Sequence, residues 1–280
     1  MFAIGEINTL RILRSTSVGL YLGDKDGNDV LLPNKYVSED FKIDDLIDVF
    51  VYKDYEQRWV ATTLMPFAKI HEFAYLRVRD VSQHGAFLEW GLEKDLFVPF
   101  REQRIKMESG RRYVVYIYQD EETQRLVAST KLNRFLSNEE LSVAPGDKVN
   151  LVVMETTPLG YNVIINQRHK GLVYHNEIFQ EIEVGDRLEG YIKLIRSEDN
   201  GIDVSLQPKG VKRLESGAQQ ILDVLKKSKG FLALHDKSEP SEIMRILNMS
   251  KKNFKNSVGI LYKQRIISLA ADGIRMIETK

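Results

Sequence analysis

A short glycine-centred segment recurs three times in the first two thirds of the chain. It reads TSVGLYL around Gly19, SQHGAFL around Gly85 and TPLGYNV around Gly160. These glycines lie 66 and 75 residues apart, which is too long for a solenoid repeat but suits one complete small barrel per copy. We therefore expect a row of small domains rather than one large core, and such rows usually bind something extended.

The three copies share one order of β-segments. Each closes on a short strand that ends in a small hydroxyl residue, at Trp59–Thr62, Leu126–Ser129 and Ile202–Ser205. Short runs rich in Val, Ile and Tyr between turn residues are typical of strands, and five of them with glycines at the corners favour an OB barrel. The sequence predicts three tandem five-stranded OB-fold barrels, in residues 1–65, 66–135 and 146–210, with a polar linker at 136–145. Because the connection at 66–72 has almost no slack, the first two barrels should pack as a pair.

The periodicity changes to that of helices after residue 210. Apolar residues then follow one helical face, at Ala218, Ile221, Leu222 and Leu225. A second helix should begin near Pro240 and a third after an N-cap at Ser250. The third helix is expected to bury Phe254, Val258, Leu261 and Tyr262. Ala271–Gly273 indicates a hairpin, so residues 211–280 are predicted to form an α+β winged helix-turn-helix. The fold class is thus multidomain and mainly β.

The charge distribution differs between the two ends of the chain. The net charge is zero, but residues 212–280 carry 14 Lys and Arg against 7 Asp and Glu, whereas residues 1–211 carry 26 against 33. The basic C-terminal domain is therefore expected to supply attraction for phosphates. Zero cysteines, no apolar run of about 20 residues and no signal-peptide pattern predict a cytoplasmic protein without membrane contact.

The second copy resembles the RNA-binding repeat of ribosomal protein S1, an OB-fold family. The resemblance is carried by the turn His84–Phe87, and by an acidic and a basic residue on the closing hairpin, Asp120 and Arg125. It implies that His84 and Phe87 stack on bases while Arg125 contacts phosphate. The family usually has a histidine where Val98 and Pro99 stand here.

The third copy matches the same family at a different motif. Residues 171–177 read GLVYHNE, similar to the family's G-L-V-H-x-S-E, with Tyr174 in the histidine place and His175 after it. Tyr161 follows the turn glycine, so the resemblance implies binding by Tyr161, Tyr174 and His175. The first copy has Val18 and Leu32 at the equivalent positions, which indicates a structural role.

The order of modules, three S1-type repeats and then a winged helix, is similar to the conserved virulence factor B family of YitL-like proteins. This resemblance covers essentially the full chain and implies a bacterial RNA-binding protein that regulates gene expression. Lysines on the outward face of the third helix are expected to contact phosphates, namely Lys251, Lys252 and Lys255.

Three interpretations remain open from the sequence. The first is a non-catalytic binder of single-stranded RNA, through stacking on the barrels and phosphate contacts from the winged helix. The second is a regulator that binds duplex DNA through the third helix, where Asn253 and Asn256 suit base edges. The third is a protein-interaction scaffold on an RNA-processing or ribosomal complex, consistent with the acidic barrels.

Nothing in the sequence predicts an enzyme, a metal site or a cofactor. The chain has no G-x-x-x-x-G-K-[ST] phosphate loop and no H-E-x-x-H motif, and its five histidines are scattered without ligand spacing. Phe97 and Phe100 are assigned to packing, because aromatic residues in small barrels are more often core than surface.

Overall fold

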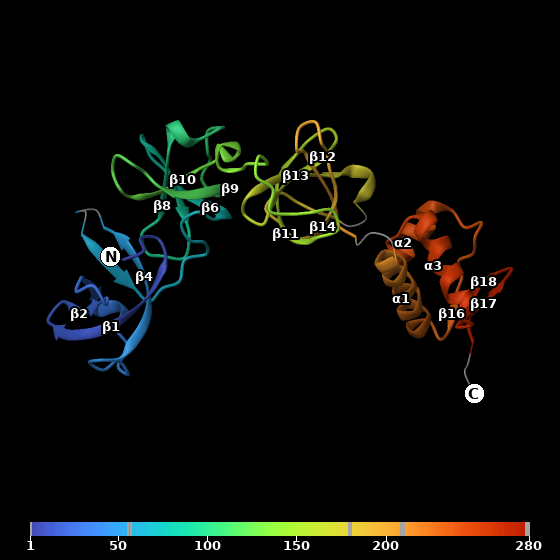
Figure 1. The fold of residues 1–280 in the computed structure, drawn as a ribbon, viewed down its shortest axis with the longest axis horizontal. Coiled ribbons are helices and arrows are strands. Elements are labelled where there is room, and N and C mark those ends of the chain that lie inside the picture. The colour runs from blue at the N-terminus through green and yellow to red at the C-terminus, as the bar shows by residue number, and fades with distance from the viewer. Residues whose placement is uncertain (1, 55, 57, 179–180, 208–210, 278–280) are drawn as a thin grey trace. The chain divides into compact units, whose positions relative to one another are not determined.

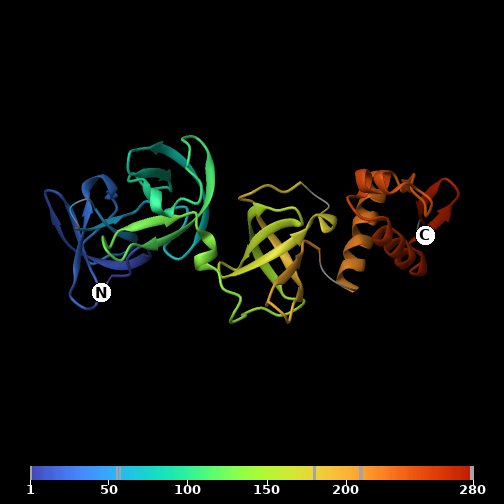
Figure 2. The same cartoon turned by 90° about the horizontal axis from the view of Figure 1, so that it is seen from above.

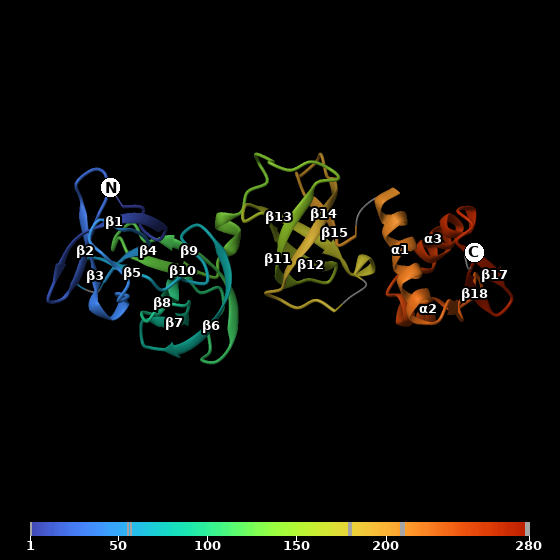
Figure 3. The ribbon, with the colours of Figure 1, turned by 90° about the horizontal axis from the view of Figure 1, so that it is seen from below.

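The computed structural model describes residues 2–54, 56, 58–178, 181–207 and 211–277. The chain divides into two compact units, Met1–Leu136 and Ser137–Lys280. Two closed barrels make up the first unit, and the second contains one closed barrel and a helical module with a small sheet. Figure 1 labels the elements of both units, and Figures 2 and 3 show the same ribbon from above and from below.

Each barrel has five strands in the same connectivity. The strands of barrel 1 are β1 (Ile7–Thr16), β2 (Gly19–Gly23), β3 (Asp29–Pro33), β4 (Leu46–Lys53) and β5 (Trp59–Thr62). Those of barrel 2 are β6 (Phe73–Val81), β7 (Gly85–Glu89), β8 (Leu96–Pro99), β9 (Arg112–Gln119) and β10 (Leu126–Ser129). Those of barrel 3 are β11 (Lys148–Thr156), β12 (Gly160–Ile165), β13 (His169–Tyr174), β14 (Arg187–Ile195) and β15 (Ile202–Ser205). In every barrel the third and fifth strands pair in parallel and close the sheet.

The recurrent glycine has a steric cause that is the same in all three barrels. A Cβ added at Gly19, Gly85 or Gly160 would lie 2.1, 2.2 or 2.0 Å from a carbonyl oxygen of the facing strand. No side chain fits such an approach, so the second and third strands can meet only at a glycine. The expectation of three tandem five-stranded barrels is confirmed.

Barrels 1 and 2 pack against each other, as the short connection predicted. The ring of Phe50 on β4 meets the edge of Trp90 with centroids 5.7 Å apart, and Phe50 belongs to the hydrophobic cluster of barrel 2. The N–H of Ile70 donates to the carbonyl of Gly5 at 3.0 Å, and Lys35 forms an ion pair with Glu93. Apolar burial together with backbone bonding joins the two barrels into one unit.

Most of the segment 136–145 is not a free linker, which corrects the expectation. His169, fully buried on β13, bonds through Nδ1 to the carbonyl oxygen of Ser137 at 2.6 Å and through Nε2 to the Ser142 hydroxyl at 2.7 Å. Val143 is buried in the core of barrel 3, and Leu141 packs against that core. Residues 137–143 are therefore part of barrel 3.

The C-terminal module is a winged helix. It consists of α1 (Val211–Lys227), β16 (Phe231–Leu232), α2 (Pro240–Leu247), α3 (Lys251–Lys263), β17 (Ile267–Ala270) and β18 (Gly273–Met276), with the sheet order β16-β18-β17. Ser250 caps α3, its hydroxyl accepting from the N–H of Asn253 at 3.3 Å. The predicted helices and hairpin are confirmed, whereas β16 was not expected.

Two side chains of α3 lie on the opposite side from that predicted. Tyr262 was expected in the core but is 55 % exposed, because its neighbour Leu261 occupies the buried face. Asn253 was a candidate for reading base edges but is only 7 % exposed, and it lies against Gly217 of α1. Of the two asparagines, only Asn256 is exposed on the surface of α3.

Candidate nucleic-acid interface

Two phenylalanines form an aromatic pair on the outer face of barrel 2. Phe87 on β7 and Phe97 on β8 are direct cross-strand partners, with ring centroids 5.2 Å apart and planes tilted by 39°. Along these strands Ala86, Leu88 and Val98 point inward and are buried, so alternation places both phenylalanines on the outside, each half-buried. Phe97 was assigned to packing, and the structure instead places it beside the predicted Phe87. Phe100 is 41 % exposed, so it too lies outside the core.

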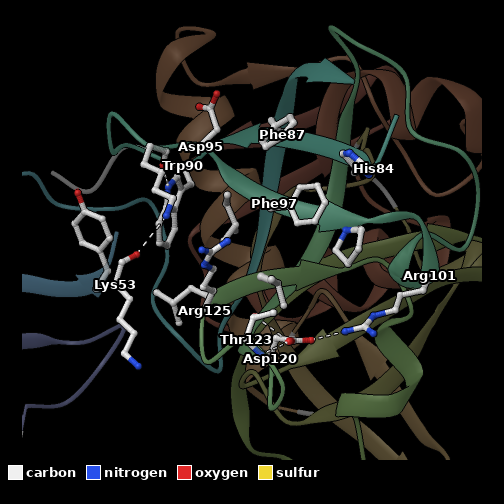
Figure 4. A pocket seen from close by; sticks show the side chains of 16 residues that line it. Lys53, His84, Phe87, Trp90, Asp95, Phe97, Arg101, Asp120, Thr123 and Arg125 are labelled. Atoms are coloured by element: carbon white, nitrogen blue, oxygen red, sulfur yellow. Dashed lines mark hydrogen bonds and ion pairs between the residues drawn. The ribbon is translucent and has the colours of Figure 1, made fainter. Parts of the chain in front are cut away.

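The aromatic pair lines a cavity of about 380 Å³ within the first unit (Figure 4). Of the predicted site residues, the structure brings together four around this cavity: His84, Phe87, Asp120 and Arg125. His84 is exposed at the turn before β7, and Arg125 comes from the β9–β10 hairpin. A flat apolar surface with a cation beside it is the arrangement on which single-stranded bases stack.

Barrel 1 contributes to one wall of the cavity. Tyr52 and Lys53 at the end of β4 line it together with Trp90 and Lys94 of barrel 2. The indole N–H of Trp90 donates to the carbonyl of Lys94 at 2.6 Å, and the Lys94 ammonium donates to the carbonyl of Lys53 at 3.3 Å. Lys94 is thereby held at the junction of the two barrels.

Positive charge gathers at this end of the cavity. Burial lowers the pKa of Lys94, and the nearby charge of Arg125 lowers it further. Both effects disfavour the ammonium ion, and an anion bound between Lys94 and Arg125 would offset the repulsion between the two cations. A phosphate of a polynucleotide supplies such an anion.

Asp120 has an organising role in the structure. It is buried, accepts from the Arg101 guanidinium at 2.5 Å, and accepts from both the N–H and the hydroxyl of Thr123 at 2.9 Å. Burial alone would raise the pKa of Asp120, but the bonds from Thr123 and the charge of Arg101 outweigh it and lower that pKa. The N–H of Asp120 also bonds to the carbonyl of Arg125 at 2.9 Å. The carboxylate thus shapes the hairpin that carries Arg125.

The predicted residues of barrel 3 are arranged differently. Tyr161 packs against the core and meets the ring of His175 edge-on, with centroids 5.5 Å apart. Tyr174 is half-buried, its hydroxyl 3.4 Å from Asp203, with the Lys193 ammonium 6.0 Å from the ring centroid. Tyr161 pairs with the inward-facing Val173 and Tyr174 is the next residue along β13, so the two tyrosines lie on opposite faces of the sheet and do not form one stacking surface.

The register positions of the aromatic pair hold other residues in barrels 1 and 3. In barrel 3 they are Asn162 and Leu172, and the Asn162 amide donates to Glu155 at 2.9 Å. In barrel 1 they are Tyr21 and Leu31, and the guanidinium of Arg14 lies 4.1 Å from the Tyr21 ring centroid. Barrel 2 is therefore the one barrel, among the described residues, in which both of these positions are aromatic.

The lysines predicted on α3 lie on the surface of the winged helix. Lys252 and Lys255 are exposed, and Lys251 at the first helical position is half-buried. All three lie on one element of the second unit. Their contact with phosphate stays a prediction.

Two residues of the site were missed from the sequence, Phe97 and Lys94. Phe97 could have been found by extending the alternation from Phe87 across the hairpin, because the two residues are register partners. Lys94 had no local signal, since its position depends on a carbonyl of barrel 1.

Metal-binding clusters and helices that could span a membrane would also indicate the class of protein. No group of three or more His, Cys, Asp or Glu side chains in the described part of the chain is placed to hold a metal ion. No described helix combines the length and the apolar character needed to cross a bilayer.

Comparison with known proteins identifies the modules. Residues 4–64 and 72–131 match the model of the S1 domain, and residues 219–276 match that of the CvfB-like winged helix domain. Conserved virulence factor B of Staphylococcus epidermidis is 25 % identical, over 98 % of this chain and 94 % of that protein. The chain belongs to the conserved virulence factor B family.

Other members and structures are similar over most of their length. Protein YitL of Bacillus subtilis is 28 % identical, over 92 % of this chain and 89 % of that protein. A crystal structure from Streptococcus pneumoniae, described as a multidomain protein with nucleic acid binding domains, is 24 % identical, covers 98 % of both chains and has a TM-score of 0.42. The S1 domains matched by residues 4–64 and 72–131 belong to a nucleic-acid-binding domain family.

Proposed function

We propose that this member of the conserved virulence factor B family binds single-stranded RNA in the cytoplasm and regulates gene expression without catalysing a reaction. The observation that carries the proposal is the outward-facing pair Phe87 and Phe97, which lines a cavity of about 380 Å³ next to Arg125 and Lys94. Stacking on aromatic rings requires bases whose faces are open, and duplexes keep those faces covered.

The charges around the cavity support the same ligand. Arg125 and Lys94 line the same cavity as the aromatic pair, so they could contact the sugar–phosphate backbone of a base stacked there. Stacking and phosphate contacts tolerate any sequence, so the proposed binding has broad sequence preference. Lysines of the winged helix would add electrostatic attraction to the same strand.

Duplex DNA is a weaker candidate for the winged helix. One of its two candidate base-reading side chains, Asn253, is buried in the contact between α1 and α3. Lysines such as Lys252 and Lys255 contact phosphates and give little base discrimination. The scaffold interpretation has support only in the acidic balance of residues 1–211.

The proposal is tested by fluorescence anisotropy of the full chain with labelled single-stranded RNA, single-stranded DNA and duplex DNA of matched length, over a salt series. We expect the tightest binding for single-stranded RNA. A clear preference for the duplex would support the DNA regulator instead. Absence of binding at low salt would support the scaffold, and ribosomal or RNA-processing proteins would then be the partners to examine.

A further inference from the structure

A second cavity lies within the winged helix, between α3 and the β17–β18 hairpin. Its volume is about 340 Å³, within the range of about 300–1,000 Å³ that is typical of ligand sites. On the α3 side it is lined by Lys255, Gly259 and Tyr262, which follow one helical face at i, i+4 and i+7. Tyr262 is 55 % exposed, and Leu269 on β17 is 54 % exposed.

No packing contact in the described part of the chain requires a glycine at position 259. It lies inside α3, where glycine is destabilising by about 0.5–1 kcal/mol relative to alanine. A Cβ added there would meet no atom within 4 Å. At Gly217 of α1, by contrast, a Cβ would lie 2.4 Å from the hydroxyl of Ser257 on α3, so helix packing requires that glycine. The bare backbone at Gly259 leaves room for something from outside the chain.

We propose that this cavity binds an unpaired base of single-stranded RNA, which stacks on Tyr262 over the bare backbone of Gly259. Tyrosine offers a flat apolar face with its hydroxyl in water, and base stacking on such a ring is independent of sequence. The site rests on the proposed function, because it assigns a further binding position for the same single strand.

The charges at the rim orient the strand. Lys255 stands at the α3 side of the cavity, and Lys252 is exposed one turn earlier on the same helix. Asp236 lines the cavity from the segment after β16 and would repel a phosphate. The backbone of the bound strand therefore runs along Lys255 and Lys252, with its base turned toward Tyr262.

The same face is poorly suited to the major groove of a duplex. Major-groove reading needs side chains that bond to base edges, and the face of α3 that lines the cavity presents Gly259 and Tyr262 instead, with Asn256 outside the cavity. A tyrosine can stack only on a base whose face is open, which selects single strands.

The experiment uses two variants of the full chain, Gly259→Ala and Tyr262→Ala, with Asn256→Ala as the matched control. Asn256 is exposed on α3 and does not line the cavity, so replacing it leaves the cavity volume unchanged. Like Gly259→Ala, Asn256→Ala introduces a better helix former. Binding of labelled single-stranded RNA is measured by anisotropy, and the thermal unfolding of α-helix by circular dichroism. Gly259→Ala should raise the unfolding midpoint and yet weaken RNA binding, an opposite pair of effects that a folding defect cannot produce.

Tyr262→Ala should weaken binding by about 5- to 150-fold, the effect of removing one stacked base, whereas Tyr262→Phe should bind within about twofold of the wild type. If Gly259→Ala and Tyr262→Ala both bind RNA like the wild type while Phe87→Ala binds more weakly, the proposed site in the winged helix is wrong and the proposed function stands. Weak binding by Asn256→Ala but not by Gly259→Ala would also overturn it, in favour of polar base reading by α3. Failure of the wild type to bind single-stranded RNA would overturn both.

Discussion

Phe87 and Phe97 face each other across β7 and β8 on the outside of barrel 2, with ring centroids 5.2 Å apart. Cross-strand pairing fixes the two rings on one side of the sheet, and the pleat keeps both out of the barrel core. Because the backbone holds them, they form a preorganised surface that needs no rearrangement to receive a base. This relationship is the basis of the proposed RNA binding.

Replacing the pair by alanine, as Phe87→Ala with Phe97→Ala, should weaken single-stranded RNA binding by about 1–3 kcal/mol per stacked base. The slope of log K against log salt should stay unchanged, because stacking releases no counterions. His84→Ala, at the rim of the same cavity, should add a smaller loss. Anisotropy titrations at several salt concentrations measure both quantities.

Phe67→Ala is the matched control for the aromatic pair. Phe67 belongs to the same unit and is 66 % exposed, but it does not line the cavity. Equal losses in the control and the double variant would mean that RNA contacts exposed aromatics in general rather than this pair.

Lys94 should neutralise one phosphate of the bound strand. Lys94→Gln is expected to reduce the salt slope by about 0.7 and to weaken binding about fivefold near 0.1 M salt, while Lys94→Arg should retain the slope of the wild type. Lys106→Gln serves as the control, since Lys106 is exposed on barrel 2 away from the cavity. An unchanged slope in Lys94→Gln would show that the cation at the barrel junction does not meet the strand.

The lysines of α3 should carry the electrostatic part of binding by the winged helix. Replacing Lys251, Lys252 and Lys255 together by alanine is expected to lower the salt slope by about 0.7 for each phosphate of the single strand that a lysine no longer neutralises. The control removes the same charge from other elements of the domain, at Lys226, Lys227 and Lys237. If the slope falls equally in the two triple variants, net charge rather than α3 attracts the strand.

Glu102 gives the first unit a specific acid sensitivity. Its carboxylate is 6 % exposed and accepts from the Arg134 guanidinium at 3.1 and 3.0 Å. Burial would raise the pKa of Glu102, but hydrogen bonds from Ser129 and Arg134 outweigh it, so that pKa lies below its usual value. A lowered pKa in the folded state contributes stability above the unfolded pKa of about 4.3, and the contribution is lost as the pH falls through the folded value.

Arg134→Gln should therefore lower the unfolding free energy by about 1–2 kcal/mol near neutral pH, and the difference from the wild type should shrink toward about pH 3. Urea unfolding followed by tryptophan fluorescence measures it in the first unit, because the two tryptophans, Trp59 and Trp90, both lie there. Lys131→Gln, at an exposed neighbouring position, should have no such effect. A difference that persists unchanged into acid would exclude the ion pair as its source.

The barrels and the winged helix could be predicted because their signals are local. The glycine at each barrel corner is required by a carbonyl about 2 Å from its missing Cβ, and the hydroxyl of Ser250 caps α3 within its own turn. Such local constraints can be recognised in the sequence without knowledge of the rest of the fold.

The parts that could not be predicted depend on distant partners. Lys94 is positioned by a carbonyl 41 residues earlier, in barrel 1. The segment 137–143 is polar in sequence, yet it joins barrel 3 because the buried His169 bonds to Ser137 and Ser142. Tyr262 was placed in the core by its hydrophobic character, although the adjacent Leu261 already fills that face of α3.

The most direct test of RNA stacking on barrel 2 is photochemical crosslinking of the full chain to single-stranded RNA that carries 5-iodouridine, followed by mass spectrometry of the crosslinked peptides. Because this base crosslinks to aromatic rings on which it stacks, we expect crosslinks at Phe87 or Phe97, and their disappearance in the double alanine variant. Efficient binding with crosslinks only outside barrel 2 would contradict the assignment of this aromatic pair as the stacking surface.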